Sequence, residues 1–300
     1  MSCKNVPIPA AAEAAGMTKL VFCEDFDNER SIDFSGEGKE GYGFYADRPY
    51  GKATLTPEEC VMKDSVLYFK PEECGSAIGL VSYSKKGRTG FLMHYGYAEA
   101  RIRADLPPAG GYNGWPAFWM MGKVDMMGEP WEHCGELDIL EIVDPKGKGR
   151  SGEAGKDMIY TGTLHHHHRT GALRENGKPF TEFASSSVIA SGYQDQFDYL
   201  DTDWHTYAAL WEPGYIAWYL DGKLMHAARF NETDIPEYYY RDDPTPVKRL
   251  AEVYPNLKER VWPGAHSVMD SDIAQEILCL GCHKDWPMEV DWVRVWQKQA

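Results

Sequence analysis

The chain has 300 residues, 43% of them hydrophobic, and its 46 acidic and 31 basic side chains give a formal charge of −15. Such a surface repels phosphate backbones and anionic lipids, and no basic run offsets it, so we expect neither nucleic acid nor an anionic membrane as a partner. No apolar run is long enough to cross a bilayer, so we expect no transmembrane helix.

The N-terminal segment, residues 1–17, is predicted to be an extension with one short helical turn. Pro9 can open the turn and Gly16 can end it. The segment lacks the apolar stretch of a signal peptide. We therefore expect a cytoplasmic protein if the sequence is complete, and an extracellular or periplasmic one if a signal peptide has been removed.

The cysteines are odd in number and scattered, which argues against a complete disulfide framework. They stand at seven positions: Cys3, Cys23, Cys60, Cys74, Cys134, Cys279 and Cys282. The last two form a CxxC pair without a second pair or a suitably spaced histidine, so we expect buried thiols there, with a metal or redox role as the less favoured alternative.

Residues 18–300 are predicted to form a single domain, because no internal repeat or low-complexity linker divides them. Alternation of apolar and other residues predominates, as in residues 97–104, where the alanines and Ile102 share one face. Further strands are expected at residues 66–70, 206–211, 216–220 and 290–296. Short strands separated by turns such as Asp221-Gly222 favour an all-β sandwich or jelly roll.

One helix is predicted at residues 245–255. Thr245 and Pro246 can cap it, the apolar residues that follow keep helical spacing, and Pro255 can end it. It lies in a polar, proline-rich stretch near 230–272, which we interpret as an insertion packed on the sandwich and not as a second domain.

The segment ELDILE carries three acids at uneven spacing. In a strand, Glu136 and Asp138 share a face, but strict alternation would turn Glu141 into the core beside Ile139. An unpaired carboxylate there would cost several kcal/mol. A β-bulge around Ile139 and Leu140 would return the third acid to the face of the first two. The spacing therefore predicts three carboxyl groups on one wall.

Three uses fit such a wall. Retaining glycoside hydrolysis needs a nucleophilic carboxylate and an acid/base carboxyl about 5–5.5 Å apart, with different proton affinities. Calcium also suits three acids, although calcium loops are usually rich in glycine and asparagine and this stretch is aliphatic. A solvated acidic face without a role is the third reading. From the spacing alone, catalysis is favoured and the other two stay open.

The segment also resembles the ExDxxE signature of glycoside hydrolase family 16 in its bulged form. Other segments resemble family motifs in the same order, and the resemblance covers roughly residues 18–297, with 230–272 as the main departure. These segments are LVFCEDFD (20–27), YGYAEARI (95–102), GWPAFWM (114–120), GTLH (162–165), WHTY (204–207), YLDG (219–222) and MEVDWVRV (288–295).

The resemblance implies a catalytic β-jelly roll of two antiparallel sheets with a carbohydrate cleft on its concave face. It implies a retaining, endo-acting mechanism with Glu136 as nucleophile, Glu141 as acid/base and Asp138 as the assisting acid. Family positions that line the sugar subsites fall on Trp115, Trp119 and Trp131. Core packing is the alternative for each tryptophan.

Further candidate substrate contacts are Asn113, His165 and Arg101. His165 occupies the position of a family histidine near the acids. For Arg101, which shares a strand face with Glu99, a cleft contact and a plain ion pair are both open. The four-histidine run could bind a transition metal, but neighbouring strand residues point to opposite faces, so at most two could share a site.

No cofactor is required by the expected chemistry. Many family members carry a structural calcium on the convex side, which involves the aspartate of the last strand, so the resemblance makes Asp291 a candidate calcium ligand.

The expected function is a retaining endo-β-glycanase acting on β-1,3- or mixed-linkage glucan. Alternatives are a β-galactanase of the agarase, porphyranase or carrageenase type, a transglycosylase, and a non-catalytic carbohydrate-binding protein. The expected partner is a polysaccharide or oligosaccharide, and the protein is expected to be a monomer.

Overall fold

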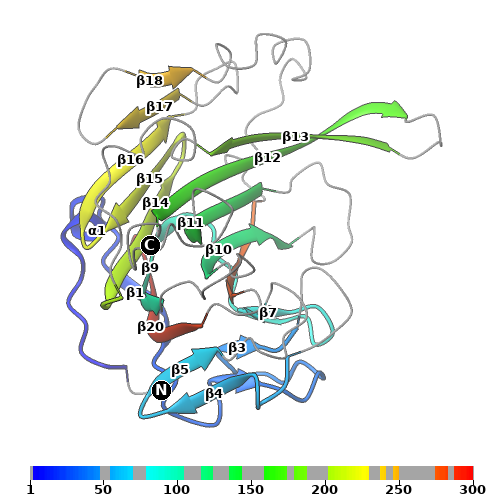
Figure 1. Cartoon of the computed structure of the whole chain (residues 1–300), viewed down its shortest axis with the longest axis vertical. Coiled ribbons are helices and arrows are strands. Elements are labelled where there is room, and N and C mark those ends of the chain that lie inside the picture. Colours follow the sequence, from blue (N-terminus) through cyan, green and yellow to red (C-terminus); the bar gives the residue numbers. More distant parts are fainter. Residues whose placement is uncertain are drawn as a thin grey trace, which may run out of the picture.

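The computed structural model describes residues 3–47, 55–69, 79–104, 116–123, 135–143, 159–173, 179–187, 202–229, 237–240, 246–249, 274–282 and 287–299. Within them lie one short helix, α1 (Ala10–Ala14), and strands that form two large sheets. Figure 1 shows these sheets as two layers. No helix in the described part of the chain has the length and apolarity to span a membrane.

The larger sheet has ten strands. In spatial order they are β18 (Pro246–Arg249), β17 (Glu237–Tyr240), β16 (Lys223–Arg229), β15 (Tyr215–Leu220), β14 (His205–Glu212), β9 (Gly96–Ala104), β20 (Met288–Gln297), β5 (Val66–Phe69) and β4 (Cys60–Lys63), with β1 (Lys19–Glu24) also paired to β20.

The other large sheet has eight strands. Their order is β13 (Pro179–Ser187), β12 (Ile159–Leu173), β11 (Gly135–Val143), β10 (Ala117–Gly122), β19 (Glu276–Gly281), β6 (Leu80–Val81), β3 (Phe44–Tyr45) and β2 (Ile32–Asp33). A separate hairpin joins β7 (Tyr83–Ser84) to β8 (Thr89–Gly90). Pairing is antiparallel except between β2 and β3.

The two large sheets face each other across one apolar core. Alternation along β9 sends Ala100 and Ile102 into this core, as the sequence predicted, and β11 sends Leu137 and Ile142 into the same core cluster. All four side chains are 0% exposed. Complete burial of a leucine or isoleucine contributes about 1.5–3 kcal/mol, so these positions fix which face of each strand is inside. The other face of each sheet points away from the core.

The N-terminal segment covers part of the outer face of the ten-stranded sheet. The predicted helical turn is confirmed as α1, which lies beside β14–β16 in Figure 1. Ala12 and Met17 pack there against Tyr97, Leu210 and Trp296. We call residues 3–17 the N-terminal strap.

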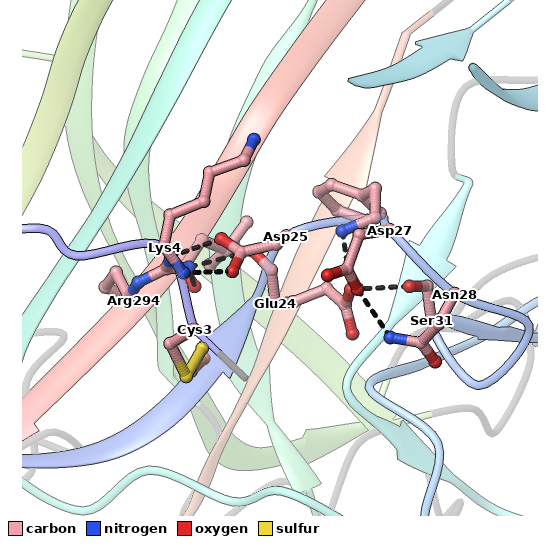
Figure 2. The surroundings of a disulfide bond; sticks show 11 residues. Cys3, Lys4, Glu24, Asp25, Asp27, Asn28, Ser31 and Arg294 are labelled. Atoms are coloured by element: carbon pink, nitrogen blue, oxygen red, sulfur yellow. Dashed lines mark hydrogen bonds and ion pairs between the residues drawn. A yellow bond between two sulfur atoms is a disulfide. The ribbon is translucent and has the colours of Figure 1, made fainter. Parts of the chain in front are cut away.

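Covalent and ionic contacts hold the strap at its start. Cys3 forms a disulfide with Cys23 of β1, and the main-chain N–H of Lys4 donates to Asp25 at 2.6 Å. Asp25 also forms a buried ion pair with Arg294 of β20 (Figure 2). Scattered spacing gave no sign of this disulfide, because its partners are 20 residues apart in sequence and meet only in the folded chain.

The helix predicted at 245–255 is wrong where the structure describes it. Residues 246–249 form the edge strand β18, which pairs with β17 and extends the ten-stranded sheet (Figure 1). Pro246 is compatible with the first position of an edge strand, because its missing N–H is not needed there for a ladder hydrogen bond. The run Tyr238-Tyr239-Tyr240 in β17 favours sheet pairing, and this pairing overrides the helical spacing.

Candidate active site

Cross-strand register places three acids of β11 on one face of the eight-stranded sheet. Residues directly opposite each other in a ladder share a face. The partners on β10 are Ala117 for Glu141, Trp119 for Asp138 and Met121 for Glu136. Because these β10 residues are spaced two apart, they lie on one face, and so do their acidic partners. We call this outer face of the sheet the acid face.

The predicted bulge is confirmed and lies at Ile139. On β10, the consecutive residues Phe118 and Trp119 oppose Leu140 and Asp138, so Ile139 is the extra residue. The ladder to β12 shifts at the same place. Ile139 and Leu140 are both fully buried in the core. The bulge therefore buries two consecutive aliphatic side chains in the core and leaves Glu141 on the acid face.

The three acids differ in environment. Asp138 is 3% exposed, whereas Glu136 and Glu141 are partly exposed. Burial, followed by the charge of Glu136, raises the pKa of Asp138 well above its usual value. A carboxyl group with a raised pKa keeps its proton to higher pH than a free aspartate, and in that protonated form it can donate a hydrogen bond to an ionised neighbour.

Threonines of β12 border the acids on the other side. Thr161 pairs with Glu141 and Thr163 pairs with Asp138. The Thr163 hydroxyl donates to the Glu141 carboxylate at 3.4 Å, and the Thr161 hydroxyl donates to the Glu141 carbonyl at the same distance. Sequence reasoning missed both residues, although their spacing of two before His165 was a usable signal.

His165 takes the next position on the same side of the acids. Its backbone pairs with that of Glu136 across the β11–β12 ladder, and its contact with substrate stays a prediction. Three other predicted substrate contacts, Asn113, Trp115 and Trp131, lie outside the described residues. Their roles stay predictions.

An apolar cluster occupies the acid face beside β11. Trp119 is 6% exposed within it, and its role at a subsite stays a prediction. The buried members are Tyr45, Val81, Tyr83, Trp119, Met121, Ile277 and Cys279. Cys282 belongs instead to the core between the sheets, so the two thiols of the CxxC pair are buried in different clusters. This confirms the expectation of buried thiols.

Arg101, for which the sequence left a substrate contact in the cleft and a plain ion pair both open, does not lie on the acid face. Alternation along β9 turns its neighbours Ala100 and Ile102 into the core, so Arg101 lies on the outer face of the opposite sheet. There it forms an ion pair with Asp291 at 2.6 Å and lies 4.9 Å from the centre of the Trp204 ring. The plain ion pair, left open by the sequence, is the arrangement that the structure has.

The surroundings of Asp291 do not fit the candidate calcium site that the resemblance raised there. One carboxylate oxygen accepts from Lys4 Nζ at 2.5 Å and the other from Arg101 at 2.6 Å. The same ammonium donates to the carbonyls of Ser65 and Asp291. Partial burial would raise the pKa of Asp291, but the hydrogen bonds from Lys4 and Arg101 outweigh it and lower the pKa. The strap thus supplies a cation of its own to this carboxylate.

No group of three or more His, Cys, Asp or Glu side chains within the described segments is arranged to hold a metal ion.

Comparisons with known proteins agree with this geometry. The family model of glycosyl hydrolases family 16 matches residues 53–270. A keratan-sulfate endo-1,4-beta-galactosidase of Sphingobacterium multivorum is 26% identical over 97% of this chain and 61% of its own length. A glucan endo-1,3-beta-glucosidase A1 of Niallia circulans is 28% identical over 43% of this chain and 15% of its own length. The chain therefore spans less than two thirds of the length of each of these relatives.

Solved structures agree on the fold. The laminarinase catalytic domain of Thermotoga maritima has a TM-score of 0.50 and 18% identity, over 94% of this chain and 99% of that one. The likeness confirms the predicted β-jelly roll, and its two large sheets are antiparallel apart from the pairing of β2 with β3. The bulged acidic strand, the sandwich that carries it and the match over most of the sequence agree, and the chain belongs to glycosyl hydrolases family 16.

Proposed function

We propose that the chain is a retaining endo-β-glycanase. The observation that carries the proposal is the bulge at Ile139, which puts Glu136 and Glu141 on one face with Asp138 between them. Double displacement needs two carboxyl groups on one wall, one ionised and one protonated, at short separation.

In the proposed reaction, Glu141 protonates the glycosidic oxygen while Glu136 attacks the anomeric carbon. Water then hydrolyses the glycosyl-enzyme, and Glu141 acts as the base. Asp138, whose pKa is raised by burial and by the charge of Glu136, donates a hydrogen bond in its protonated form and so orients the Glu136 carboxylate. The Thr163 hydroxyl, which donates to Glu141, helps to fix the acid/base group.

We propose β-1,3- or mixed-linkage glucan as substrate. The relative that bears a glucan endo-1,3-beta-glucosidase name supports this class. A β-galactan is the second candidate, because the relative named for keratan sulfate aligns over 97% of this chain. We propose that the protein acts as a monomer, which size-exclusion chromatography with light scattering tests.

A screen for new reducing ends tests both substrate classes. Laminarin, lichenan, agarose, porphyran, carrageenan and keratan sulfate are incubated with wild type and with Glu136→Gln. We expect release from one class by wild type, and a loss of several orders of magnitude in the variant while its melting temperature stays close to wild type. Near-full turnover by the variant would remove Glu136 as nucleophile.

Two further readouts distinguish the remaining functions. Proton NMR of the first products is expected to show the anomer retained, and an inverted anomer would contradict the mechanism. Sugar binding in calorimetry without any new reducing end would identify a binding protein, and glycosyl transfer to added oligosaccharide in preference to water would identify a transglycosylase.

A further inference from the structure

A hydrogen bond crosses the core from one sheet to the other. The indole Nε1 of Trp218, on β15 of the ten-stranded sheet, donates to the main-chain carbonyl of Asp138 on β11 at 2.8 Å. Trp218 is 0% exposed and Asp138 is 3% exposed. Facing sheets of a sandwich meet mostly through apolar side chains. A hydrogen bond between them is therefore unusual, and its location is informative.

That place is the start of the bulge. The carbonyl belongs to the peptide between Asp138 and Ile139, where the register of β11 shifts against both neighbouring strands. A bulge disrupts the ladder locally, and a buried carbonyl there needs a partner. The indole of Trp218 provides one from outside the sheet.

The donor also stands at an irregularity in its own sheet. Trp218 pairs with His226 and the next residue, Tyr219, pairs with Leu224, so Met225 of β16 is an extra residue beside Trp218. The hydrogen bond therefore joins two bulged places in the two sheets. Each irregularity restricts the register in which its strand can pair, and the hydrogen bond links the register of one sheet to that of the other.

We propose that Trp218 is a positioning residue for the catalytic carboxyl groups, an inference that rests on the proposed function. Its N–H fixes the peptide at which β11 changes phase, and this phase decides that Glu141 lies on the same wall as Glu136. A return to regular pairing would turn Glu141 toward the core. Trp218 touches no substrate, and it acts through the backbone of Asp138.

Trp218→Phe keeps an aromatic ring and removes the N–H. We expect kcat to fall about 10- to 100-fold, because a small misplacement of reacting groups has effects of this size. KM is expected to change far less, since the sugar-binding surface is intact, and the pH dependence of kcat is expected to shift with the altered spacing of the two glutamates.

Trp211→Phe is the matched control. Trp211 is also fully buried in the same core, but it lies on β14 against His94 and Tyr95. The Trp211→Phe variant is expected to lose stability and to keep the kcat and the pH profile of wild type. Equal losses of kcat in the two variants, in proportion to lost stability, would overturn the proposal.

A closer isostere removes the remaining ambiguity. Incorporation of 3-benzothienylalanine at position 218 replaces the N–H by sulfur with almost no change of shape. We expect this protein to melt near wild type and to show the kcat and pH-profile changes of Trp218→Phe. Wild-type kcat and pH profile in this protein would show that ring packing, and not the hydrogen bond, is what matters.

Hydrogen exchange of the Trp218 indole proton separates a failure of this proposal from a failure of the proposed function. The proton is assigned by its absence from the Trp218→Phe spectrum and needs no substrate to be observed. A protected proton in a wild type that cleaves no polysaccharide would reject the proposed function. An unprotected proton would reject the positioning role itself.

Discussion

Single carboxyl groups in this protein differ in proton affinity according to burial. Asp138 and Glu99 are both almost completely buried, and burial is the largest cause of the raised pKa of each. Asp138 lies on the acid face, whereas Glu99 lies on the outer face of the opposite sheet, next to Tyr97. The same physical effect therefore acts at a residue proposed for catalysis in one place and at a residue remote from the acid face in the other.

For Asp138, the raised pKa favours the protonated, neutral side chain as the form that donates a hydrogen bond to Glu136 in the proposed mechanism. Asp138→Asn keeps a neutral hydrogen-bond donor and is expected to retain kcat within about tenfold of wild type, whereas Asp138→Ala is expected to lose about 10²–10³-fold. Steady-state kinetics at pH 7 compares the two. An asparagine variant as impaired as the alanine variant would show that the ionised form is required.

For Glu99, burial raises the pKa from 4.5 to about 7, with a smaller contribution from the charge of Asp221. The folded protein therefore binds a proton that the unfolded chain releases near pH 4.5. The stability from this proton is complete below that pH and is lost as pH rises through about 7.

Glu99→Gln cannot ionise and is expected to unfold with a free energy about 3 kcal/mol higher than wild type above pH 7, and with little difference at low pH. Urea unfolding at several pH values measures this. Glu13→Gln, at an exposed position, is the control and is expected to change the free energy of unfolding only slightly. A constant difference between Glu99→Gln and wild type at all pH values would contradict the linkage.

Elements were predictable from sequence where a local pattern decided them. Period-two alternation identified β9, and an acid that broke the alternation identified the bulge in β11. The edge strand β18 was missed, because pairing with β17 prevailed over local helical spacing. The Trp218 bond links residues 80 apart in sequence, and no local pattern carries such a contact.

The strap is an element whose contact with Asp291 can be tested directly. Lys4→Met keeps much of the side-chain length and removes the ammonium. We expect a loss of about 1 kcal/mol in the free energy of unfolding, a modest value because Lys4 is 36% exposed and solvent screens the pair. Lys86→Met, which removes the exposed pair with Glu37, is the control and should cost less.

Removal and addition of metal test whether Asp291 binds calcium. Because Lys4 and Arg101 already hold both oxygens of Asp291, we expect the melting temperature of wild type to stay the same with EDTA or with added calcium. A melting temperature that falls with EDTA in wild type and in Lys86→Met would show a bound metal and contradict this account.

Across the whole molecule, the features that stabilise the chain end and those proposed for catalysis lie on opposite outer faces. The strap packs on the ten-stranded sheet, and the acids lie on the far side of the eight-stranded sheet, with the shared core between. A change at the strap must pass through two close-packed layers to reach the acids. Stability and turnover should therefore separate.

Cys3→Ser tests this separation at the disulfide. The bond closes a loop with a sequence separation of 20, so its loss is expected to lower the free energy of unfolding by about 3 kcal/mol. Well below the melting temperature, kcat should equal that of wild type, because the acid face keeps its register. A reductant should lower the melting temperature of wild type toward that of the variant and leave the variant unchanged. A fall in kcat at a temperature where the variant is fully folded would show that the strap communicates with the acids through the core, and Trp218, which spans it, would then be the first residue to examine.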